Sequence, residues 1–259
     1  MPIGLSAYET GKKLAGNYDK QLLQLQEQLA QLQSLHIASN ARTLIVFEGW
    51  DASGKGGAIQ CITASLDARY IQAYPIAAPT TEEKGKHFLS RFWSKLPGPR
   101  QMHIWDGSHY GRVLYERVEG ICSEAEWRRG FDEINEFESQ QVDIGTGLIK
   151  IFLHVTPETQ DKVLRARMDD PSKQWKVTTK TFHNRSNRAA YMSAMTDMFK
   201  FTDTRWAPWA VFDANNIKAA QIAVLEHVVS KLESHLPKEF PQTDPAISAL
   251  AKKAFGKKS

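Results

Sequence analysis

The sequence predicts an α/β protein in which a parallel sheet is covered by helices on both faces. Short apolar runs alternate with segments of helical periodicity along most of the chain, as in strands joined by crossover helices. A glycine-rich segment follows the first apolar run, where a strand would turn sharply into a helix. Of the 259 residues, 42% are hydrophobic and 24% are charged. This ordinary composition excludes a disordered, collagen-like or disulfide-rich chain.

Five apolar runs account for the predicted sheet. Each is short enough to be a strand and is followed by a turn signal or a helical pattern. The longest internal helix places Trp127, Phe131, Ile134 and Phe137 on one face, which we expect to face inward. The predicted strands are 43–48, 71–77, 102–106, 148–155 and 209–213, and the predicted helices are 55–69, 81–95, 124–141 and 219–236.

An amphipathic helix is expected before this domain. Four leucines recur on one face of the segment 19–35: Leu22, Leu25, Leu29 and Leu32. The helix should therefore pack on the domain or on a partner subunit. We expect three parts in the chain. These are an N-terminal helical extension at 1–40, a core domain at 41–240 that includes a basic lid at about 160–200, and a basic tail at 241–259.

The net charge of +4 lies in the last nine residues, which hold four lysines and no acid. A solvated tail explains this charge better than nucleic-acid binding does. No run approaches 18 apolar residues, and the segment 1–11 has no basic start followed by an apolar core. Cys61 and Cys122 fit no metal or redox spacing. We therefore expect a cytoplasmic protein with free thiols that binds neither nucleic acid nor a membrane.

The glycine-rich segment 47–57, FEGWDASGKGG, contains the pattern G-x-x-x-x-G-K. An apolar strand enters it and a helix leaves it, which is the context of a phosphate-binding loop. In such a loop backbone N–H groups and the helix N-terminus face phosphate oxygens, and Lys55 adds a full positive charge. The alternative is a glycine-rich turn with an exposed lysine. The predicted phosphate-binding positions are Gly49, Ala52, Ser53, Gly54, Gly56 and Gly57.

Two aspartates are candidate Mg²⁺ ligands. The residue after the loop lysine is usually Ser or Thr, whose hydroxyl binds the metal, but here it is Gly56. Asp51 lies inside the loop, where a divalent cation would relieve its repulsion from phosphate. Asp106 ends the neighbouring strand and would be the second ligand. The alternatives are a solvent-facing turn former at Asp51 and a helix N-cap at Asp106. We expect His109 to be structural or to bind phosphate, because no second ligand residue accompanies it.

A basic segment separates the fourth and fifth predicted strands. Residues 161–188 hold eight lysines and arginines and three acids, so their net charge of +5 exceeds that of the whole chain. An insertion of this size and charge, late in an α/β sheet, is typical of a lid that closes over a polyanion. Surface ion pairs are the alternative role for these cations.

Seven blocks in this order make the chain resemble the family-2 polyphosphate kinases, which move phosphate between inorganic polyphosphate and nucleotides. The resemblance runs from about residue 11 to residue 232. The blocks are FEGWDASGKGGAI (47–59), APTTEEKGKHFLSRFW (78–93), WDGSHYGRVLYERVEG (105–120), FDEINEFE (131–138), FLHVTPETQ (152–160), RARMDDPSKQWK (165–176) and TRWAPWAVFDA (204–214).

The resemblance implies a P-loop kinase fold of the thymidylate-kinase type, a three-layer sandwich with a helical lid. It implies that Asp51 and Asp106 hold Mg²⁺ and that Lys55 is the loop lysine. The family's members associate, so a homodimer or homotetramer is implied. The resemblance further assigns a catalytic role to Arg112 and phosphate binding to Arg91 and to the lid residues Arg165, Arg167 and Lys176.

The chain also departs from the family pattern. The block usually reads D-R-S-W-Y-G-R, but Gly107 replaces its arginine and His109 its tryptophan. Residues 178–187 follow the family pattern poorly. Residues 215–218 read NNIK, where an acidic Asp-Lys pair is common in the family. The blocks look most like the class acting on nucleoside monophosphates, so we expect direct, in-line transfer from polyphosphate to AMP. The alternatives are ADP to ATP (or GDP to GTP), an ATP-dependent small-molecule kinase, and a non-catalytic polyphosphate or nucleotide sensor.

Overall fold

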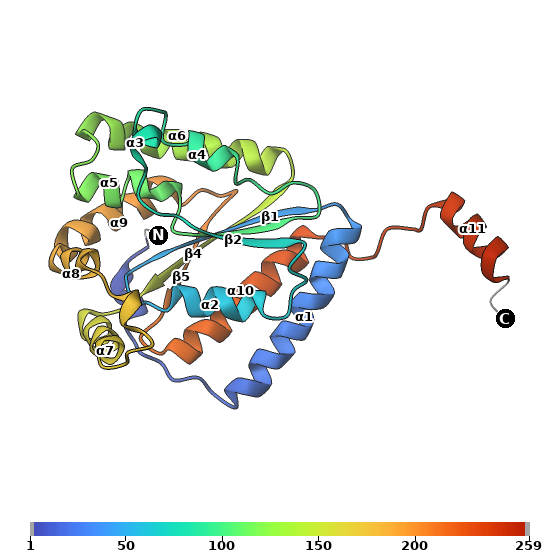
Figure 1. Ribbon diagram of the computed structural model, residues 1–259, viewed down its shortest axis with the longest axis horizontal. Helices are drawn as coiled ribbons and strands as arrows, with labels where there is room; N and C mark the ends of the chain where they lie inside the picture. The colour runs from blue at the N-terminus through green and yellow to red at the C-terminus, as the bar shows by residue number, and fades with distance from the viewer. Residues whose placement is uncertain (1–2, 257–259) are drawn as a thin grey trace.

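The computed structural model describes residues 3–256 and has a five-stranded parallel sheet at its centre (Figure 1). The strand order β2-β3-β1-β4-β5 places the first strand in the middle, so its carboxyl end lies at the centre of one sheet edge. The predicted fold class is confirmed. The strands are β1 (Arg42–Gly49), β2 (Ile71–Pro75), β3 (Met102–Asp106), β4 (Thr146–His154) and β5 (Trp209–Asp213).

Helices cover both faces of this sheet and make the three layers (Figure 1). On one face lie α1 (Tyr18–Ala38), α2 (Lys55–Thr63) and α10 (Ile217–His235), which contact one another. On the other lie α6 (Glu124–Asp143) and α9 (Arg188–Thr202), with α6 against β4. The remaining helices are η1 (Leu5–Tyr8), α3 (Thr81–Lys84), α4 (Ser90–Trp93), η2 (His109–Arg112), α5 (Tyr115–Val118), α7 (Pro157–Met168), η3 (Gln174–Lys176), α8 (Thr179–Ser186) and α11 (Pro245–Phe255).

The inward faces follow the sequence pattern. On α1, Leu29 is fully buried, and the other three leucines of the predicted stripe are partly buried against the core. The residues Phe131, Ile134 and Phe137 of α6 are buried as expected, whereas Trp127 is only partly buried. The amphipathic faces therefore contribute apolar surface to the same core that the strands build.

Several predicted element boundaries differ from those of the structure. The segment 81–95 forms two short helices, because Gly85 ends α3 and residues 84–87 are exposed, so no apolar face holds them in a helix. The helix predicted at 55–69 ends at Thr63, since the Asp67 N–H leaves the helix to donate to Gln33 Oε1 on α1 (2.7 Å). Strand β2 ends at Pro75, two residues early.

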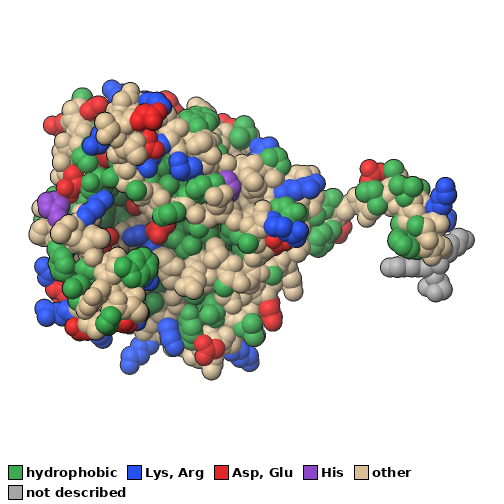
Figure 2. Space-filling model, in the orientation of Figure 1, with side chains coloured by type: hydrophobic (Ala, Val, Ile, Leu, Met, Phe, Trp, Pro, Cys, Tyr) green, Lys and Arg blue, Asp and Glu red, His purple; other side chains and the backbone are tan. Residues whose placement is uncertain are grey.

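The chain leaves the domain after α10. The helix α11 stands apart from the body with Ile247, Leu250 and Phe255 exposed (Figures 1 and 2). Lys257 and Lys258 of the predicted basic tail lie outside the described residues. Cys61 and Cys122 are free thiols. Within residues 3–256, no helix combines the length and the apolar character needed to cross a membrane.

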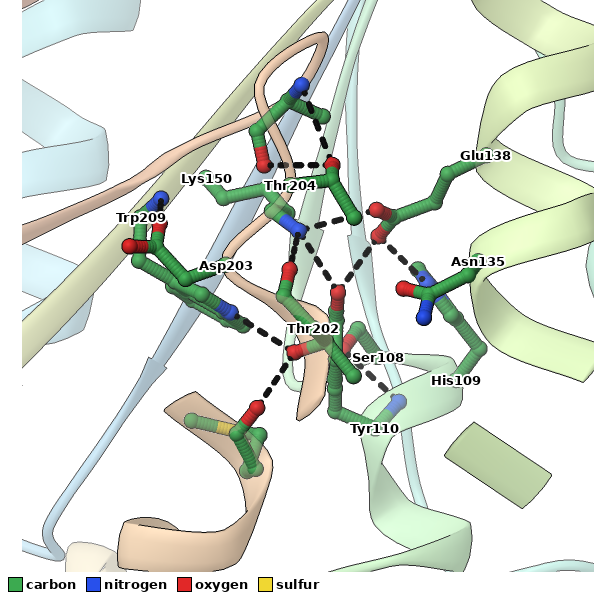
Figure 3. Close-up of polar contacts among 12 residues, drawn as sticks. Ser108, His109, Tyr110, Asn135, Glu138, Lys150, Thr202, Asp203, Thr204 and Trp209 are labelled. Atoms are coloured by element: carbon green, nitrogen blue, oxygen red, sulfur yellow. Dashed lines mark hydrogen bonds and ion pairs between the residues drawn. The ribbon is translucent and has the colours of Figure 1, made fainter. Parts of the chain in front are cut away.

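A buried polar cluster lies between β4, α6 and η2 (Figure 3). The Lys150 ammonium on β4 donates to Glu138 Oε2 (2.9 Å), Tyr110 Oη (2.9 Å) and the Thr202 carbonyl (2.7 Å). His109 Nε2 lies 3.0 Å from Glu138 Oε1, to which the Tyr110 hydroxyl also donates. Burial acts to raise the pKa of Glu138, but the Lys150 charge and the His109 contact hold it below its ordinary value. The contact with Glu138 agrees with a structural role for His109, which is one of the two roles expected from the sequence.

Candidate active site

The loop between β1 and α2 has a backbone that few residues can adopt. Gly49 has φ +139°, and a Cβ at this position would lie 2.3 Å from the Leu153 carbonyl oxygen of the adjacent strand β4. Gly54 is left-handed (φ +90°) at the N-cap of α2, and Ala52 is also left-handed (φ 65°). The turn therefore brings the loop backbone tightly onto the N-terminus of α2, where free N–H groups favour an anion.

Lys55 is the first residue of α2 and folds back over this loop. Its Nζ donates to the carbonyl oxygens of Gly49 (2.9 Å) and Trp50 (3.1 Å). An ammonium has three N–H donors, so a third remains for a ligand. The sequence alternative, a turn with an exposed lysine, does not describe this half-buried and hydrogen-bonded side chain.

One cavity of about 580 Å³ joins the loop, the sheet edge and the lid. Its lining combines carboxylates with cations from four separate parts of the chain. They include Asp51 and Lys55 from the loop, Asp106 from β3, Arg91 from α4 and Lys180 from α8, and the amide of Asn184 lies beside them. A volume of this size accommodates a small polar substrate such as a nucleotide.

Both predicted metal ligands line this cavity. Asp51 Oδ2 accepts a hydrogen bond from Asn184 Nδ2 of the lid (3.0 Å), so Asp51 is not a solvent-facing turn former. Asp106 is not a helix cap, because Ser108 caps η2 through the Tyr110 N–H. The register pairs Asp106 with Phe47, two residues before the end of β1, so the ends of the two strands bring the acids to the same sheet edge.

The donor set fits Mg²⁺. Asp51 and Asp106 are among the carboxylates that line the cavity, and among residues 3–256 no group of three or more His, Cys, Asp or Glu side chains forms a complete metal site. Mg²⁺ commonly binds through one or two carboxylates and takes its other ligands from water and substrate phosphates. Asp51 and Asp106 could therefore hold this ion with water and substrate phosphate as its remaining ligands.

A third carboxylate, Glu48, was missed by the sequence analysis. It is the penultimate residue of the buried strand β1 and accepts a hydrogen bond from the Ser108 hydroxyl (2.7 Å). Burial raises the pKa of Glu48 to about 7, against the opposing effects of Ser108 and the Lys55 charge. The signal that could have identified this position is a glutamate near the end of an otherwise apolar strand.

The two predicted arginines outside the lid are held by acids. Arg91 lies 3.4 Å from Glu83 and donates to the Ala77 carbonyl, at the wall of the main cavity. Arg112 lies 3.3 Å from Glu116 and stacks over Phe88, and it lines a neighbouring cavity of about 210 Å³ rather than the main one. A substrate contact of Arg112 stays a prediction.

The predicted lid cations point in different directions. Arg167 is half-buried and feels the charge of Asp51, which opposes the lowering of the Arg167 pKa by burial. Arg165 lines a separate cavity between α7 and α8, and Lys176 lies exposed over Trp175. Their binding of phosphate stays a prediction. Lys180, which the sequence analysis counted only as part of the lid charge, lines the main cavity.

An aromatic stack attaches the lid to the loop. The Arg188 guanidinium at the start of α9 lies 3.9 Å from the centre of the Trp50 ring and donates to Gln160 Oε1. Gln160 in turn donates to the Asp51 carbonyl (3.0 Å), and Trp50 donates to His154 of β4 (2.9 Å). These contacts place α7 and the start of α9 next to the loop.

A five-stranded 2-3-1-4-5 parallel sheet, a glycine-rich loop with its lysine and a helical lid define a protein with the P-loop kinase fold. The chain belongs to the polyphosphate kinase 2 family, whose model matches residues 13–240. The crystal structure of polyphosphate kinase 2 from Arthrobacter aurescens TC1 has a TM-score of 0.88 and 32% identity, covering 97% of this chain and 93% of that one.

Two curated relatives show the range of activities in the family. The polyphosphate:AMP phosphotransferase of Pseudomonas aeruginosa is 40% identical over 86% of this chain and 45% of its own length. The ADP-polyphosphate phosphotransferase 3 of Rhizobium meliloti is 37% identical over 84% of this chain and 76% of its own length. The chain thus spans about half the length of the first relative.

Proposed function

We propose that this protein transfers a phosphoryl group from inorganic polyphosphate to a nucleotide, with AMP as the acceptor and ADP as the product. One observation carries the proposal: the loop lysine Lys55 lines a single cavity with the carboxylates of Asp51 and Asp106 and with the lid cation Lys180. Carboxylates beside a phosphate-binding loop need a divalent cation to offset their repulsion from phosphate. This combination suits transfer between two polyanions.

Mg²⁺ bound by Asp51 and Asp106 would neutralise charge on the transferred phosphoryl group. Lys55 would donate to its oxygens, since one N–H of the ammonium is free of the loop carbonyls. A phosphate oxygen of the nucleotide is already ionised at neutral pH, so the reaction needs no general base. Catalysis then consists of positioning and charge neutralisation in a direct, in-line transfer. A phosphorylated side chain trapped in a quench experiment would contradict this mechanism.

The choice of AMP is supported by the polyphosphate:AMP phosphotransferase at 40% identity. ADP as acceptor is the second candidate, because the ADP-polyphosphate phosphotransferase at 37% identity is matched over 76% of its length. A nucleoside diphosphate has one phosphate more than AMP. The preferred acceptor therefore depends on how far the nucleotide extends into the cavity from Lys55.

The test is to incubate the protein with Mg²⁺ and either polyphosphate or ATP as donor, and either AMP or ADP as acceptor. We expect ADP from polyphosphate and AMP, at a rate well above that of ATP formation from ADP. Faster transfer to ADP would establish the second candidate. Transfer from ATP alone would indicate an ATP-dependent kinase, and binding without transfer a sensor. Either of the last two results overturns the proposal.

We also propose that the protein is cytoplasmic and forms a homodimer or homotetramer. Free cysteines fit a reducing compartment. The exposed apolar residues Ile247, Leu250 and Phe255 of α11 favour self-association. Light scattering coupled to size exclusion gives the mass of the assembly, and a monomer at micromolar concentration would contradict this proposal.

A further inference from the structure

Lys180, on the lid helix α8, is distinguished from the other cations of residues 161–188 by its place at the main cavity. It lines the main cavity, whereas Arg185 pairs with Asp161 and Lys173 pairs with Asp170 on the outside of the lid. Among the described residues no carboxylate lies within 4.0 Å of the Lys180 ammonium, the limit for an ion pair. The charge of Lys180 is therefore available to a ligand in the cavity.

The side chain of Lys180 is held over the cavity by an aromatic ring. Its Nζ lies 3.6 Å from the centre of the Tyr115 ring, the shortest cation–π distance among the described residues. Lys180 is exposed as a whole residue, but partial burial of its ammonium lowers the pKa of Lys180, and the charges of Asp51 and Glu119 oppose this shift. An anion that entered the cavity would stabilise the ammonium and would leave its contact with the ring intact.

Helix α8, which carries Lys180, contacts the loop through Asn184, one helical turn after Lys180. Asn184 donates to Asp51 Oδ2, and the Tyr191 hydroxyl donates to Asn184 Oδ1 (3.1 Å), which orients the amide. Residues four apart lie on the same face of a helix. Lys180 and Asn184 therefore face the cavity together, with Lys180 one helical turn from the residue that contacts Asp51.

We propose that Lys180 binds the polyphosphate chain, at a phosphate adjacent to the one that Lys55 contacts. This inference rests on the proposed function for the identity of the ligand. Polyphosphate is favoured over the nucleotide because it bears a negative charge on every unit, so it gains from each further cation along its path. A nucleotide would place neutral groups on part of the same path.

The experiment compares Lys180→Met, Lys180→Arg and the matched control Lys162→Met, which removes an exposed lysine of α7 outside the cavity. Equilibrium binding is measured with polyphosphate of one chain length, without nucleotide. We expect about tenfold weaker binding for Lys180→Met, equivalent to roughly 1.4 kcal/mol, and less than about twofold change for the other two. In the transfer assay the KM for polyphosphate should rise by the same factor while kcat and the KM for AMP stay near wild type.

Unchanged polyphosphate binding in Lys180→Met would overturn the assignment, and so would an effect confined to the KM for AMP. A wild-type protein that binds polyphosphate without transferring it would contradict the proposed function and leave the Lys180 assignment supported by the binding data. A wild-type protein that binds no polyphosphate would overturn both.

Discussion

Lys150 and Lys55 belong to two regions that use the same chemical groups for opposite purposes. In the buried cluster, Lys150 donates all three of its N–H groups, to Glu138, Tyr110 and a backbone carbonyl, and no surface of it is exposed. At the loop, Lys55 has two carbonyl partners and faces an open cavity. A buried charge with every hydrogen bond satisfied stabilises one arrangement of the fold, whereas a charge with an unused donor can bind a ligand.

One short segment connects the two regions. Asp106 ends β3 at the cavity, and three residues later His109 and Tyr110 turn into the buried cluster. Ser108, between them, donates to Glu48 at the cavity wall. The cluster therefore holds the segment that positions Asp106, so loss of the cluster should reduce stability and loss of Asp106 should reduce rate alone.

The largest expected effect is on stability. Lys150→Met leaves Glu138 as a buried carboxylate without its cation, which should cost about 3–5 kcal/mol of unfolding free energy. Denaturant unfolding measures this cost. The matched variant Lys150→Met with Glu138→Leu removes both charges and should recover much of the loss. A single variant as stable as wild type would show that the cluster does not support the fold.

The next largest effect is on rate. Asp106→Asn keeps the shape of the side chain and removes its charge, so transfer should fall by about 100-fold or more, equivalent to roughly 2.7 kcal/mol of barrier. The unfolding free energy should stay within about 0.5 kcal/mol of wild type. Added Mg²⁺ should restore part of the rate by mass action. Wild-type transfer at ordinary Mg²⁺ would remove Asp106 from the metal site.

A smaller effect depends on pH and concerns the framework. His36 on α1 is buried against Thr43 of β1, and burial lowers the pKa of His36 to about 4. In the unfolded chain His36 takes up a proton as pH falls below about 6.5, whereas in the folded protein it does so only near pH 4. The unfolding free energy should therefore decrease as pH falls from 6.5 to 4. From pH 7 to pH 5 the contribution of His36 is about 2 kcal/mol.

The variant His36→Gln should remove that part of the pH dependence, with the difference read from denaturant curves at pH 7 and pH 5. The transfer rate of the folded fraction should respond to pH in the same way in both proteins. An identical loss of stability in the variant would assign the pH dependence to other groups.

The sequence predicted most of the fold because its strands and long helices have clear periodicity. The strand β1, the loop that follows it and Asp106 could all be placed from local pattern. The 81–95 segment could not, since its helical pattern lacked enough buried residues to remain continuous. Lys180 and Asn184 could not be identified either, because their role depends on how α8 folds back onto Asp51 from 133 residues away. The cluster of Lys150 and Glu138 likewise joins a strand and a helix through tertiary packing alone.

The most direct test of the distinction between the two regions is a paired measurement on Lys55→Met. Its rate of phosphoryl transfer from polyphosphate to AMP and its unfolding free energy are compared with those of wild type under the same conditions. We predict a rate at least about 100-fold lower with an unfolding free energy changed by less than about 1 kcal/mol. Transfer at the wild-type rate by the folded variant would contradict the assignment of the reaction to this cavity.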